Sequence, residues 1–468
     1  MSVKSNTPNR RVEPLEVCNP EAVRTALAAG ASASAETVRE LLYKADSLAG
    51  LTPEEVAVLL QVQAPGLREE IIEAGRKVHQ KRYGRRVRLS APVCPSNRCV
   101  DDCLYCPLRR SNTRLRRNAS TSRELQRDIL SLLDEGHRYI ALVFGDDRSG
   151  VPYVRDMISA SFGARSGSRQ VQRLDLNVNP VKPEDLPQLH LSSRFGAYHV
   201  FQETYDPETY TALHPSGPKA DYEARLLCHD RALQAGLPEV GLGVLLGAYD
   251  FRFDVVALMG HLQHLQTTYH SRAYAITYPR MIPVAGAPAS QGPERQISDE
   301  DFIFVVATTR LAAPALDIIL STPAPSDVRR RLYACGASQV SVGTASYPGV
   351  YTADGDPSAA GGLSIGRPRA LEDLVYRMAE VGFIPNLCVT SAAEVKRTPA
   401  GEFSVIERDG ANALLALKEY VMDYASPETR LIGERLIQSE LAKLPKKLRD
   451  MTLDLMEEAE AGFRGQVL

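Results

Sequence analysis

From about residue 86 onward, short apolar runs alternate with longer amphipathic segments. The short runs are rich in Val, Ile, Leu, Tyr and Thr, and most end in or just before a small, polar or proline residue, which is typical of buried strands. The longer segments carry apolar residues at helical spacing, and one of them opens with the capping residue Ser298. The short runs predict strands at residues 87–93, 139–146, 173–179, 197–205, 239–247, 273–280, 316–322 and 338–344.

Eight strands that alternate with helices predict an α/β protein whose parallel sheet closes into a (β/α)8 TIM-type barrel. An open, doubly wound sheet is the alternative. We favour the barrel because the strand count reaches eight before the pattern stops. Groups that carry chemistry in such a barrel lie at the C-terminal ends of its strands. The stretch 99–106, which follows the first strand, is therefore expected at that mouth.

Helical sequence flanks the barrel on both sides. Before it, Thr52 can cap a helix that starts with Pro53, and Glu55 completes a capping box. After about residue 345 a loop rich in Gly and Pro interrupts the pattern, and amphipathic helices follow. We predict an N-terminal helical segment at 1–83, the barrel at 84–368 and a C-terminal helical extension at 369–468.

Composition narrows the class of protein. Lys and Arg number 55 against 57 Asp and Glu, a net charge of -2 that gives no reason to expect a nucleic-acid partner. The sequence has neither a signal-peptide core nor an apolar run long enough to span a membrane, so we expect a cytoplasmic protein with reduced thiols. The basic run 109–117 is interpreted either as a solvated loop or as a lid over an anionic ligand.

Three of the eight cysteines, Cys99, Cys103 and Cys106, stand within eight residues of one another. Three thiolates on a short loop can hold three irons of a 4Fe-4S cubane, which normally has four thiolates, and leave the fourth iron open. S-adenosylmethionine can bind that iron through its amino and carboxylate groups. One electron then splits its sulfonium and yields a 5'-deoxyadenosyl radical.

A closed zinc site is the alternative for this cluster of thiols. Cys94 lies five residues before Cys99, so four thiolates fall within thirteen residues, and four thiolates can close a structural zinc site. Zinc ribbons usually split their ligands into two distant pairs, which disfavours this interpretation. Tyr105 is either a core aromatic or, in the radical interpretation, a ring beside the adenine or the substrate.

The C-x3-C-x-Y-C pattern after a first barrel strand resembles the radical S-adenosylmethionine superfamily. The stretch "CVDDCLYCPLRRSN" resembles the branch of the tyrosine lyases HydG and ThiH, and the similarity continues through "FQETYDPETYTALHPSGPKADY" and "NALLALKEYVMDYASPETR". It covers the chain from about Thr52 to its end. The matching C-terminal extension makes HydG the nearer of the two.

The resemblance implies a single 4Fe-4S cluster on Cys99, Cys103 and Cys106, with S-adenosylmethionine beside it. It also implies roles for residues at the ends of the following strands and on one helix. The implied cofactor-binding residues are Tyr105 beside the adenine or the substrate, Gly145 and Asp146 for the methionine amino end, Gln202 and Glu203 for the ribose and methionine, Arg225 or Arg231 for the carboxylate, and Gly243 for the adenine.

The sequence departs from this branch in three respects: the cysteines of the C-terminal extension, Pro323 and Ile282. HydG holds a second cluster in its C-terminal extension with three cysteines, whereas this chain keeps Cys388, has Ser391 at the second position and has no cysteine at 407–411. One thiol cannot hold such a cluster. In addition, Pro323 and Ile282 stand where the lyases tend to have arginines that would grip an amino-acid carboxylate.

We therefore expect an oxygen-sensitive, lyase-type radical enzyme that acts on a small, non-tyrosine substrate and makes neither carbon monoxide nor cyanide. Its electrons would come from a reductant such as ferredoxin or flavodoxin. Tyrosine Cα–Cβ cleavage to p-cresol and dehydroglycine is the alternative, with Arg280 or Ser341 as the catalytic-site residue that holds the carboxylate. A non-catalytic iron–sulfur scaffold or metal-precursor carrier is the rival of another class.

Overall fold

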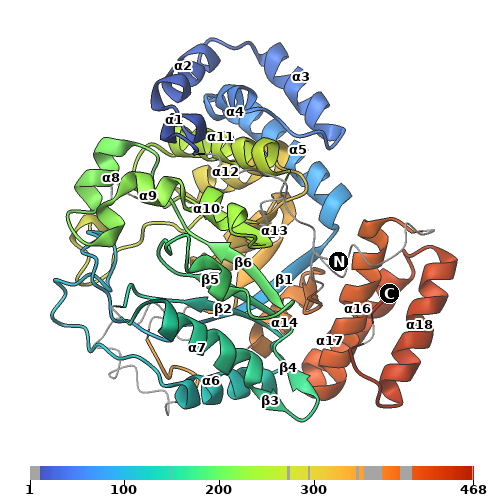
Figure 1. Ribbon diagram of the computed structural model, residues 1–468. Coiled ribbons are helices and arrows are strands. Elements are labelled where there is room, and N and C mark those ends of the chain that lie inside the picture. Colours follow the sequence, from blue (N-terminus) through green and yellow to red (C-terminus); the bar gives the residue numbers. More distant parts are fainter. Residues whose placement is uncertain are drawn as a thin grey trace.

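The computed structural model describes residues 11–147, 149–270, 275–292, 296–343, 347–352, 371–389, 403–465 and 467–468. Eight parallel strands form a closed barrel in its centre, as the sequence predicts, and β10 pairs with β1 to close it (Figure 1). In order around the barrel these strands are β1 (Arg86–Val93), β2 (Tyr139–Val143), β5 (Arg173–Asn177), β6 (Phe195–His199), β7 (Glu239–Gly243), β8 (Ala275–Thr277), β9 (Asp317–Leu320) and β10 (Gln339–Ser341).

Most strands end earlier than the apolar runs that predicted them. β2 stops at Val143 although the run continues to residue 146, and β6 stops at His199 although its run continues to residue 205. The remaining residues leave the sheet ladder and turn over the mouth of the barrel, still largely buried. The ends of the predicted strands therefore become the loops that carry the polar residues of the mouth.

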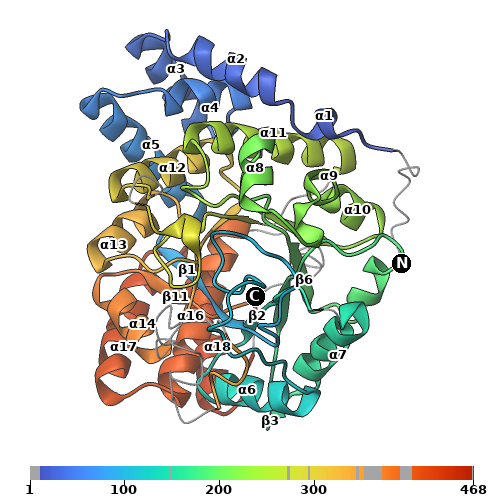
Figure 2. The same cartoon turned by 90° about the vertical axis from the view of Figure 1, so that its left-hand side faces the viewer.

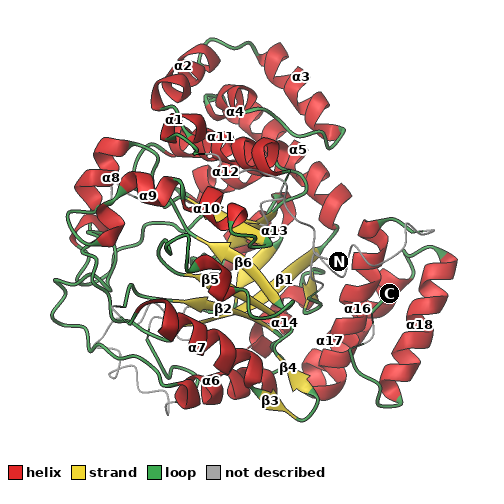
Figure 3. Cartoon of the chain, in the orientation of Figure 1, coloured by secondary structure: helices red, strands yellow, loops and turns green. Residues whose placement is uncertain are grey.

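Helices surround the barrel (Figure 3). Between β5 and β6 the described chain forms only the short 3-10 helix η1 (Leu186–Leu189), in a stretch that contains three prolines. A small hairpin, β3 (Arg165–Ser166) with β4 (Arg169–Gln170), precedes β5. The other elements around the barrel are α6 (Ser122–Asp134), α7 (Gly150–Gly163), α8 (Pro207–Leu213), η2 (Pro218–Ala220), α9 (Tyr222–Leu226), α10 (Cys228–Gln234), α11 (Phe251–Tyr269), η3 (Pro288–Ser290), α12 (Asp299–Ala312) and α13 (Ser326–Cys335).

The N-terminal helices pack on one side of the barrel, against α11 and α12 (Figures 1 and 2). Thr52 and Glu55 form the predicted capping box at the start of α4. A Cβ at Gly75 would lie 2.9 Å from the Cβ of Ala307, so two small residues allow α5 to approach α12 closely. These helices are α1 (Pro14–Val17), α2 (Pro20–Gly30), α3 (Ala35–Asp46), α4 (Pro53–Leu60) and α5 (Pro65–Tyr83).

The C-terminal extension is tied to the barrel through a ninth parallel strand, β11 (Ile384–Asn386), which pairs with the first residues of β1. Its helices are α14 (Leu371–Glu380), α16 (Val405–Asp423), α17 (Pro427–Leu441) and α18 (Lys446–Glu460) (Figure 1). The division of the chain into three parts stays a prediction. Within the described ranges, no helix combines the length and the apolar character that a membrane crossing requires.

Candidate active site at the mouth of the barrel

The loop between β1 and α6 carries the three cysteines, and polar side chains fix its shape. The Asp102 carboxylate accepts two N–H groups of Arg109, at 2.8 and 2.9 Å, and the backbone N–H and hydroxyl of Ser111. The Arg109 guanidinium and these further donors hold the pKa of Asp102 well below its usual range. Arg117 donates to the carbonyls of Asn97 and Leu108, at 3.2 and 3.0 Å. The loop is therefore built before any ligand binds.

The three predicted iron ligands lie together in this loop. Cys103 is buried, and Cys99 and Cys106 are half-buried. Burial raises the pKa of each thiol, that of Cys103 to about 11, and charge on Cys103 and Cys99 raises the pKa of Cys106 further. The Lys219 ammonium opposes this effect at Cys103 and Cys106. Because iron binds thiolates, filling the site must release protons.

Cys94 stands apart from this group. Its thiol is buried and donates to the Ser96 carbonyl at 3.3 Å, and burial raises its pKa to about 12. In the described part of the chain, no three His, Cys, Asp or Glu side chains converge as ligands of one metal ion, which a zinc site would require.

Asp146, which follows β2, lies against the cysteine loop. Its carbonyl accepts the Val100 N–H at 3.0 Å. The Asn179 amide donates both to the Asp146 carboxylate, at 3.0 Å, and to the Asp101 carboxylate, at 2.6 Å. Burial and the charge of Asp101 raise the pKa of Asp146. Two carboxylates held this close would be stabilised by an ammonium group, which supports the role predicted for Asp146.

Gln202 and Glu203 follow β6 in a strained turn. Glu203 has a φ of 72°, a left-handed conformation that costs about 1–3 kcal/mol for a residue other than glycine. Burial raises the pKa of Glu203, but Lys219, whose Nζ lies 2.5 Å from its carboxylate, and Arg225 lower it by more. The amide nitrogen of Gln202 is buried and has no hydrogen-bond partner among the described residues. A bound cofactor offering an acceptor would satisfy that donor.

Of the two arginines predicted for the methionine carboxylate, the structure brings one to the site. Arg225 is buried, and it donates to the Phe201 carbonyl at 2.5 Å and to the Asn179 side chain at 3.0 Å. Arg231 is half-buried on α10, and its guanidinium donates to the Ala224 carbonyl at 3.5 Å. The geometry therefore favours Arg225 over Arg231.

Two predicted glycines make room for protein groups. A Cβ at Gly145 would overlap the Arg98 carbonyl, so this glycine lets the cysteine loop approach the end of β2. A Cβ at Gly243 would lie 2.6 Å from the ring of Phe201, so that ring occupies the space above β7. Their predicted roles toward S-adenosylmethionine stay predictions.

Tyr105 is held by a histidine that the sequence did not single out. The His214 Nδ1 lies 2.7 Å from the Tyr210 carbonyl and must donate to it, so in the neutral ring Nε2 accepts from the Tyr105 hydroxyl at 2.9 Å. Burial and the nearby Lys219 lower the pKa of His214 to about 3, which keeps the ring neutral. The Lys219 Nζ lies 5.4 Å from the centre of the Tyr105 ring. Tyr105 is thus oriented beside the cysteines.

The two residues predicted to grip an amino-acid carboxylate differ in their surroundings. Arg280 already pairs with Asp299, at 2.7 Å, and donates to the Ile297 carbonyl at 2.9 Å, both at the start of α12. This does not favour a role for Arg280 toward a substrate carboxylate. Ser341 is half-buried at the end of β10, opposite Ser90 of β1. Its role stays a prediction.

Four residues of this site are not indicated by the sequence pattern: Asp101, Asn179, His214 and Lys219. Each acts through a partner that is distant in the chain, such as Lys219 on Glu203, sixteen residues away, or Asn179 on Asp101, 78 residues away. Asn179 could have been found, because it ends a predicted strand. Asp101 and His214 lie in loops and Lys219 lies on the short 3-10 helix η2, and the apolar pattern does not predict the course of these segments.

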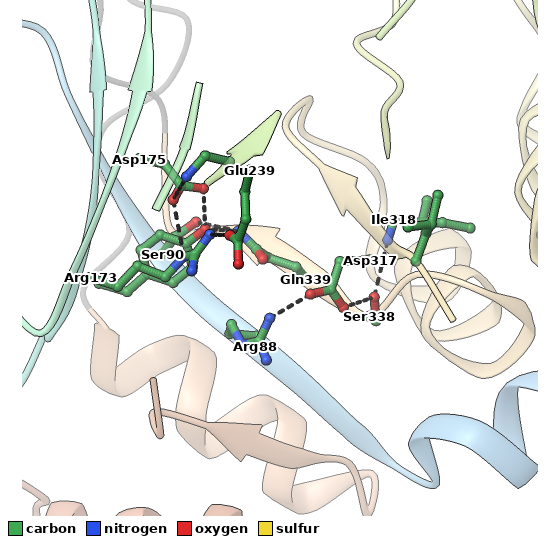
Figure 4. A network of polar contacts seen from close by, with 12 residues as sticks. Arg88, Ser90, Arg173, Asp175, Glu239, Asp317, Ile318, Ser338 and Gln339 are labelled. Carbon is green, nitrogen blue, oxygen red and sulfur yellow. Dashed lines mark hydrogen bonds and ion pairs between the residues drawn. The ribbon is translucent and has the colours of Figure 1, made fainter. Parts of the chain in front are cut away.

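Below the mouth, a layer of buried charged and polar groups crosses the barrel (Figure 4). Arg173 pairs with Asp175 at 3.0 Å and with Glu239 at 2.5 Å, and Asp175 also accepts from Tyr139 and from His199, the latter at 2.8 Å. On the far side of the layer, Arg88 pairs with Asp317 at 2.5 Å and Ser338 donates to Asp317 at 2.7 Å.

The charged layer is expected to contribute to the free energy of unfolding. Burial raises the pKa of Asp175, but Arg173, His199 and Tyr139 lower it by more, so the carboxylate is charged and paired. Asp175→Asn should lower the free energy of unfolding by about 3 kcal/mol, because it leaves buried donors without their counter-charge. Asp134→Asn, in an exposed ion pair with Arg169, should cost less than about 1 kcal/mol. Urea unfolding at neutral pH measures the free energy of unfolding of both variants.

The larger loss of unfolding free energy in Asp175→Asn should depend on pH, and the pKa of Asp175 gives the direction. The pKa of Asp175 is lower in the folded chain, so its stabilisation is present above the unfolded value of about 3.9. It disappears as the pH falls toward the folded value. Equal losses for Asp175→Asn and Asp134→Asn at neutral pH would contradict the assignment of a charged, stabilising Asp175.

Cys388 lies at the opposite end of the barrel from the cysteine loop. It lines a small polar cavity of about 30 Å³ together with residues of β1 and α16, among them Arg86, Asp409 and Asn412. Its backbone N–H donates to the Asn386 side chain at 3.0 Å. Ser391 lies outside the described residues. Residues 369–468 contain no second cysteine, so the thiols of a second cluster are missing.

Two family descriptions match the chain. "Radical SAM superfamily" matches residues 93–258, from the last residue of β1 through the cysteine loop and β7, and "Biotin and Thiamin Synthesis associated domain" matches residues 277–384. The first match covers the three thiols and also Asp146, Gln202, Glu203, His214, Lys219 and Arg225. The three-cysteine motif Cys99, Cys103 and Cys106 therefore lies within the part of the chain that matches the radical SAM superfamily.

Proteins of one branch resemble the chain over most of its length. The 2-iminoacetate synthase of Escherichia coli (strain K12) is 30% identical over 312 residues, which are 66% of this chain and 79% of that protein. A crystal structure of HydG, a maturase of the FeFe-hydrogenase, has a TM-score of 0.88 and 30% identity and covers 97% of this chain and 99% of its own. HydG from Carboxydothermus hydrogenoformans has a TM-score of 0.82 and 25% identity, over 95% and 100% of the two chains.

Proposed function

Because this chain belongs to the radical S-adenosylmethionine superfamily, in the branch of 2-iminoacetate synthase and HydG, we propose that it is a one-cluster enzyme acting on a small substrate inside the barrel. The observation that carries the proposal is the preformed three-thiol loop at the mouth of the barrel. When bound, a 4Fe-4S cluster and S-adenosylmethionine supply a 5'-deoxyadenosyl radical that abstracts hydrogen from a substrate.

The side chains around the thiols have distinct roles in this proposal. Cys99, Cys103 and Cys106 hold the cluster. Asp146, with Asp101 beside it, accepts the ammonium of the methionine moiety, and Arg225 pairs with its carboxylate, as a guanidinium does well. The side chain of Asn179 connects these residues. Its amide donates to the carboxylates of Asp101 and Asp146, and its oxygen accepts from Arg225.

A second set of side chains bounds the space for the nucleoside and the substrate. Tyr105, oriented by His214, flanks the adenine, and the unpaired amide of Gln202 donates to the ribose. His199 forms the floor, because its Nε2 binds Asp175 and its ring fills the place of a missing side chain at Gly241.

The substrate differs from tyrosine in this proposal. Pro323 and Ile282 carry no charge, and the guanidinium of Arg280 is already neutralised by Asp299. A tyrosine carboxylate would find no free cation at these three positions, and leaving one partner of a buried ion pair unmatched typically costs about 3–5 kcal/mol. Tyrosine Cα–Cβ cleavage is the second candidate, favoured by the 30% identity to 2-iminoacetate synthase.

A substrate screen tests this choice. Anaerobic, reconstituted protein with S-adenosylmethionine and dithionite should form 5'-deoxyadenosine slowly without substrate. Tyrosine should not raise that rate by more than about twofold, because its carboxylate finds no cationic partner and so contributes no binding energy. Other amino acids and hydroxylated amines are tested in parallel by liquid chromatography. Strong stimulation by tyrosine with formation of p-cresol would reject the non-tyrosine proposal in favour of the lyase.

A further inference from the structure

The strained turn after β6 is tied to α11 by one buried carboxyl group. Glu203 keeps its left-handed φ of 72° because the chain on both sides of its side chain is fixed. The Glu203 carbonyl accepts the Leu245 N–H at 2.8 Å. One oxygen of Asp254, in the first turn of α11, accepts both the Thr204 hydroxyl at 2.9 Å and the Tyr205 N–H at 2.8 Å. The two residues after Glu203 are therefore anchored to a single atom of α11.

Asp254 serves this turn as a neutral acceptor. Its side chain is buried, as is that of Thr204. Burial raises the pKa of Asp254 to about 8, although its two hydrogen bonds lower it, so the neutral carboxyl predominates at neutral pH. A group in that state contributes through the hydrogen bonds that it accepts rather than through its charge. Its loss would leave two buried donors of the turn unsatisfied.

The N-terminal helices close the anchor from the outside. α1 contacts α9 and α11, and α2 contacts α11 (Figures 1 and 2). Arg24 of α2 pairs with Asp206 at 2.9 Å, and the Asp206 N–H donates to the Thr204 hydroxyl at 3.1 Å. The segment after Glu203 is thus held from behind, while the Glu203 carboxylate reaches the polar groups at the mouth of the barrel.

We propose that Asp254 is a positioning residue for S-adenosylmethionine, because it holds the turn that presents Gln202 and Glu203 to the cofactor. The inference rests on the proposed function. Without the Asp254 acceptor, Glu203 relaxes to a negative φ, which is the ordinary conformation of a residue other than glycine. The unpaired amide of Gln202 and the carboxylate of Glu203 then leave their places. The apparent affinity for the cofactor falls in proportion to the fraction of chains that keep the strained turn.

Cofactor binding and hydrogen exchange test this role. In Asp254→Ala, the dissociation constant of S-adenosylmethionine, measured by isothermal titration calorimetry on reconstituted protein, should rise at least about tenfold with unchanged iron content. The backbone amides of residues 204–206 should exchange with deuterium faster, whether or not the cluster is present. Asp254→Asn keeps an accepting oxygen and matches the neutral carboxyl in size, so its dissociation constant should stay within about twofold of that of the unmodified protein.

Asp230→Ala is the matched control. Asp230 is also a buried carboxylate, and it accepts from His264 of α11 and from Tyr269, both at 2.7 Å. His264 lies about 15 Å further along α11 than Asp254, given the rise of a helix per residue. The control should unfold at lower urea concentration, but it should leave both the dissociation constant and the exchange of residues 204–206 unchanged.

A glycine background tests whether Asp254 acts through the strained backbone. Glycine adopts a positive φ without strain, so in Glu203→Gly the further change Asp254→Ala should weaken binding by less than about twofold. Thr204→Val removes one donor to Asp254 at nearly constant size and should weaken binding in the unmodified background. This variant decides the question if Asp254→Ala does not fold.

Three results would overturn the positioning role. They are unchanged affinity in Asp254→Ala or, where that variant does not fold, in Thr204→Val; an equal loss of affinity in Asp230→Ala; and a full tenfold further loss in the Glu203→Gly background. If the unmodified, reconstituted protein bound no S-adenosylmethionine, the proposed function itself would be rejected, and the positioning role with it.

Discussion

Replacing Cys99, Cys103 and Cys106 together with alanine should abolish iron binding and cleavage of S-adenosylmethionine. The unmodified protein, reconstituted anaerobically, should hold about four irons per chain, as one cubane held by thiolates requires. The loop itself should keep its shape in the variant, because Asp102, Arg109 and Arg117 fix it without the thiols. Iron and sulfide analysis with the visible absorption spectrum measures the loss.

Cys94→Ala is the matched control for this variant. The Cys94 thiol is buried and donates to the Ser96 carbonyl, outside the group of three. Its removal should leave the iron content unchanged, and the electron paramagnetic resonance signal of the reduced cluster should still shift when S-adenosylmethionine is added. Loss of iron in Cys94→Ala, or a count near eight irons in the unmodified protein, would refute the single cluster on Cys99, Cys103 and Cys106.

The sequence alone was sufficient to predict the barrel, because its strands are short, apolar and separated by helices. All eight predicted runs contain a barrel strand. Their ends were predicted too late, since the apolar pattern continues into the turns that follow β2 and β6. Burial of those turns against the cysteine loop produces the same pattern as burial in a sheet, so periodicity cannot separate the two.

The candidate site was predictable where its residues form a local motif. Cys99, Cys103 and Cys106 are such a motif, and the structure brings them together. Lys219 and His214 are not, because their roles depend on contacts with Glu203 and Tyr105 across the mouth. The choice between Arg225 and Arg231 was also open, since both lie within one short helical stretch and only packing shows which one reaches Asn179.

The second large effect that we expect is the absence of carbon monoxide and cyanide in any turnover of tyrosine. In HydG those products depend on a second cluster in the C-terminal extension, as the resemblance implies. In this chain Cys388 is the one cysteine beyond residue 369, and it lies beside a polar cavity lined by Arg86 and Asp409. A serine hydroxyl, as at Ser391, is a poor substitute for a thiolate toward a soft iron site.

The measurement that tests this account most directly is anaerobic incubation with tyrosine, S-adenosylmethionine and dithionite, with haemoglobin added to trap carbon monoxide. The expected result is a haemoglobin spectrum that does not change with time, in a sample where 5'-deoxyadenosine still forms at its basal rate. p-Cresol without carbon monoxide would show a tyrosine lyase that stops at the first step. A carboxyhaemoglobin spectrum that grows with turnover would contradict the account of a single-cluster enzyme.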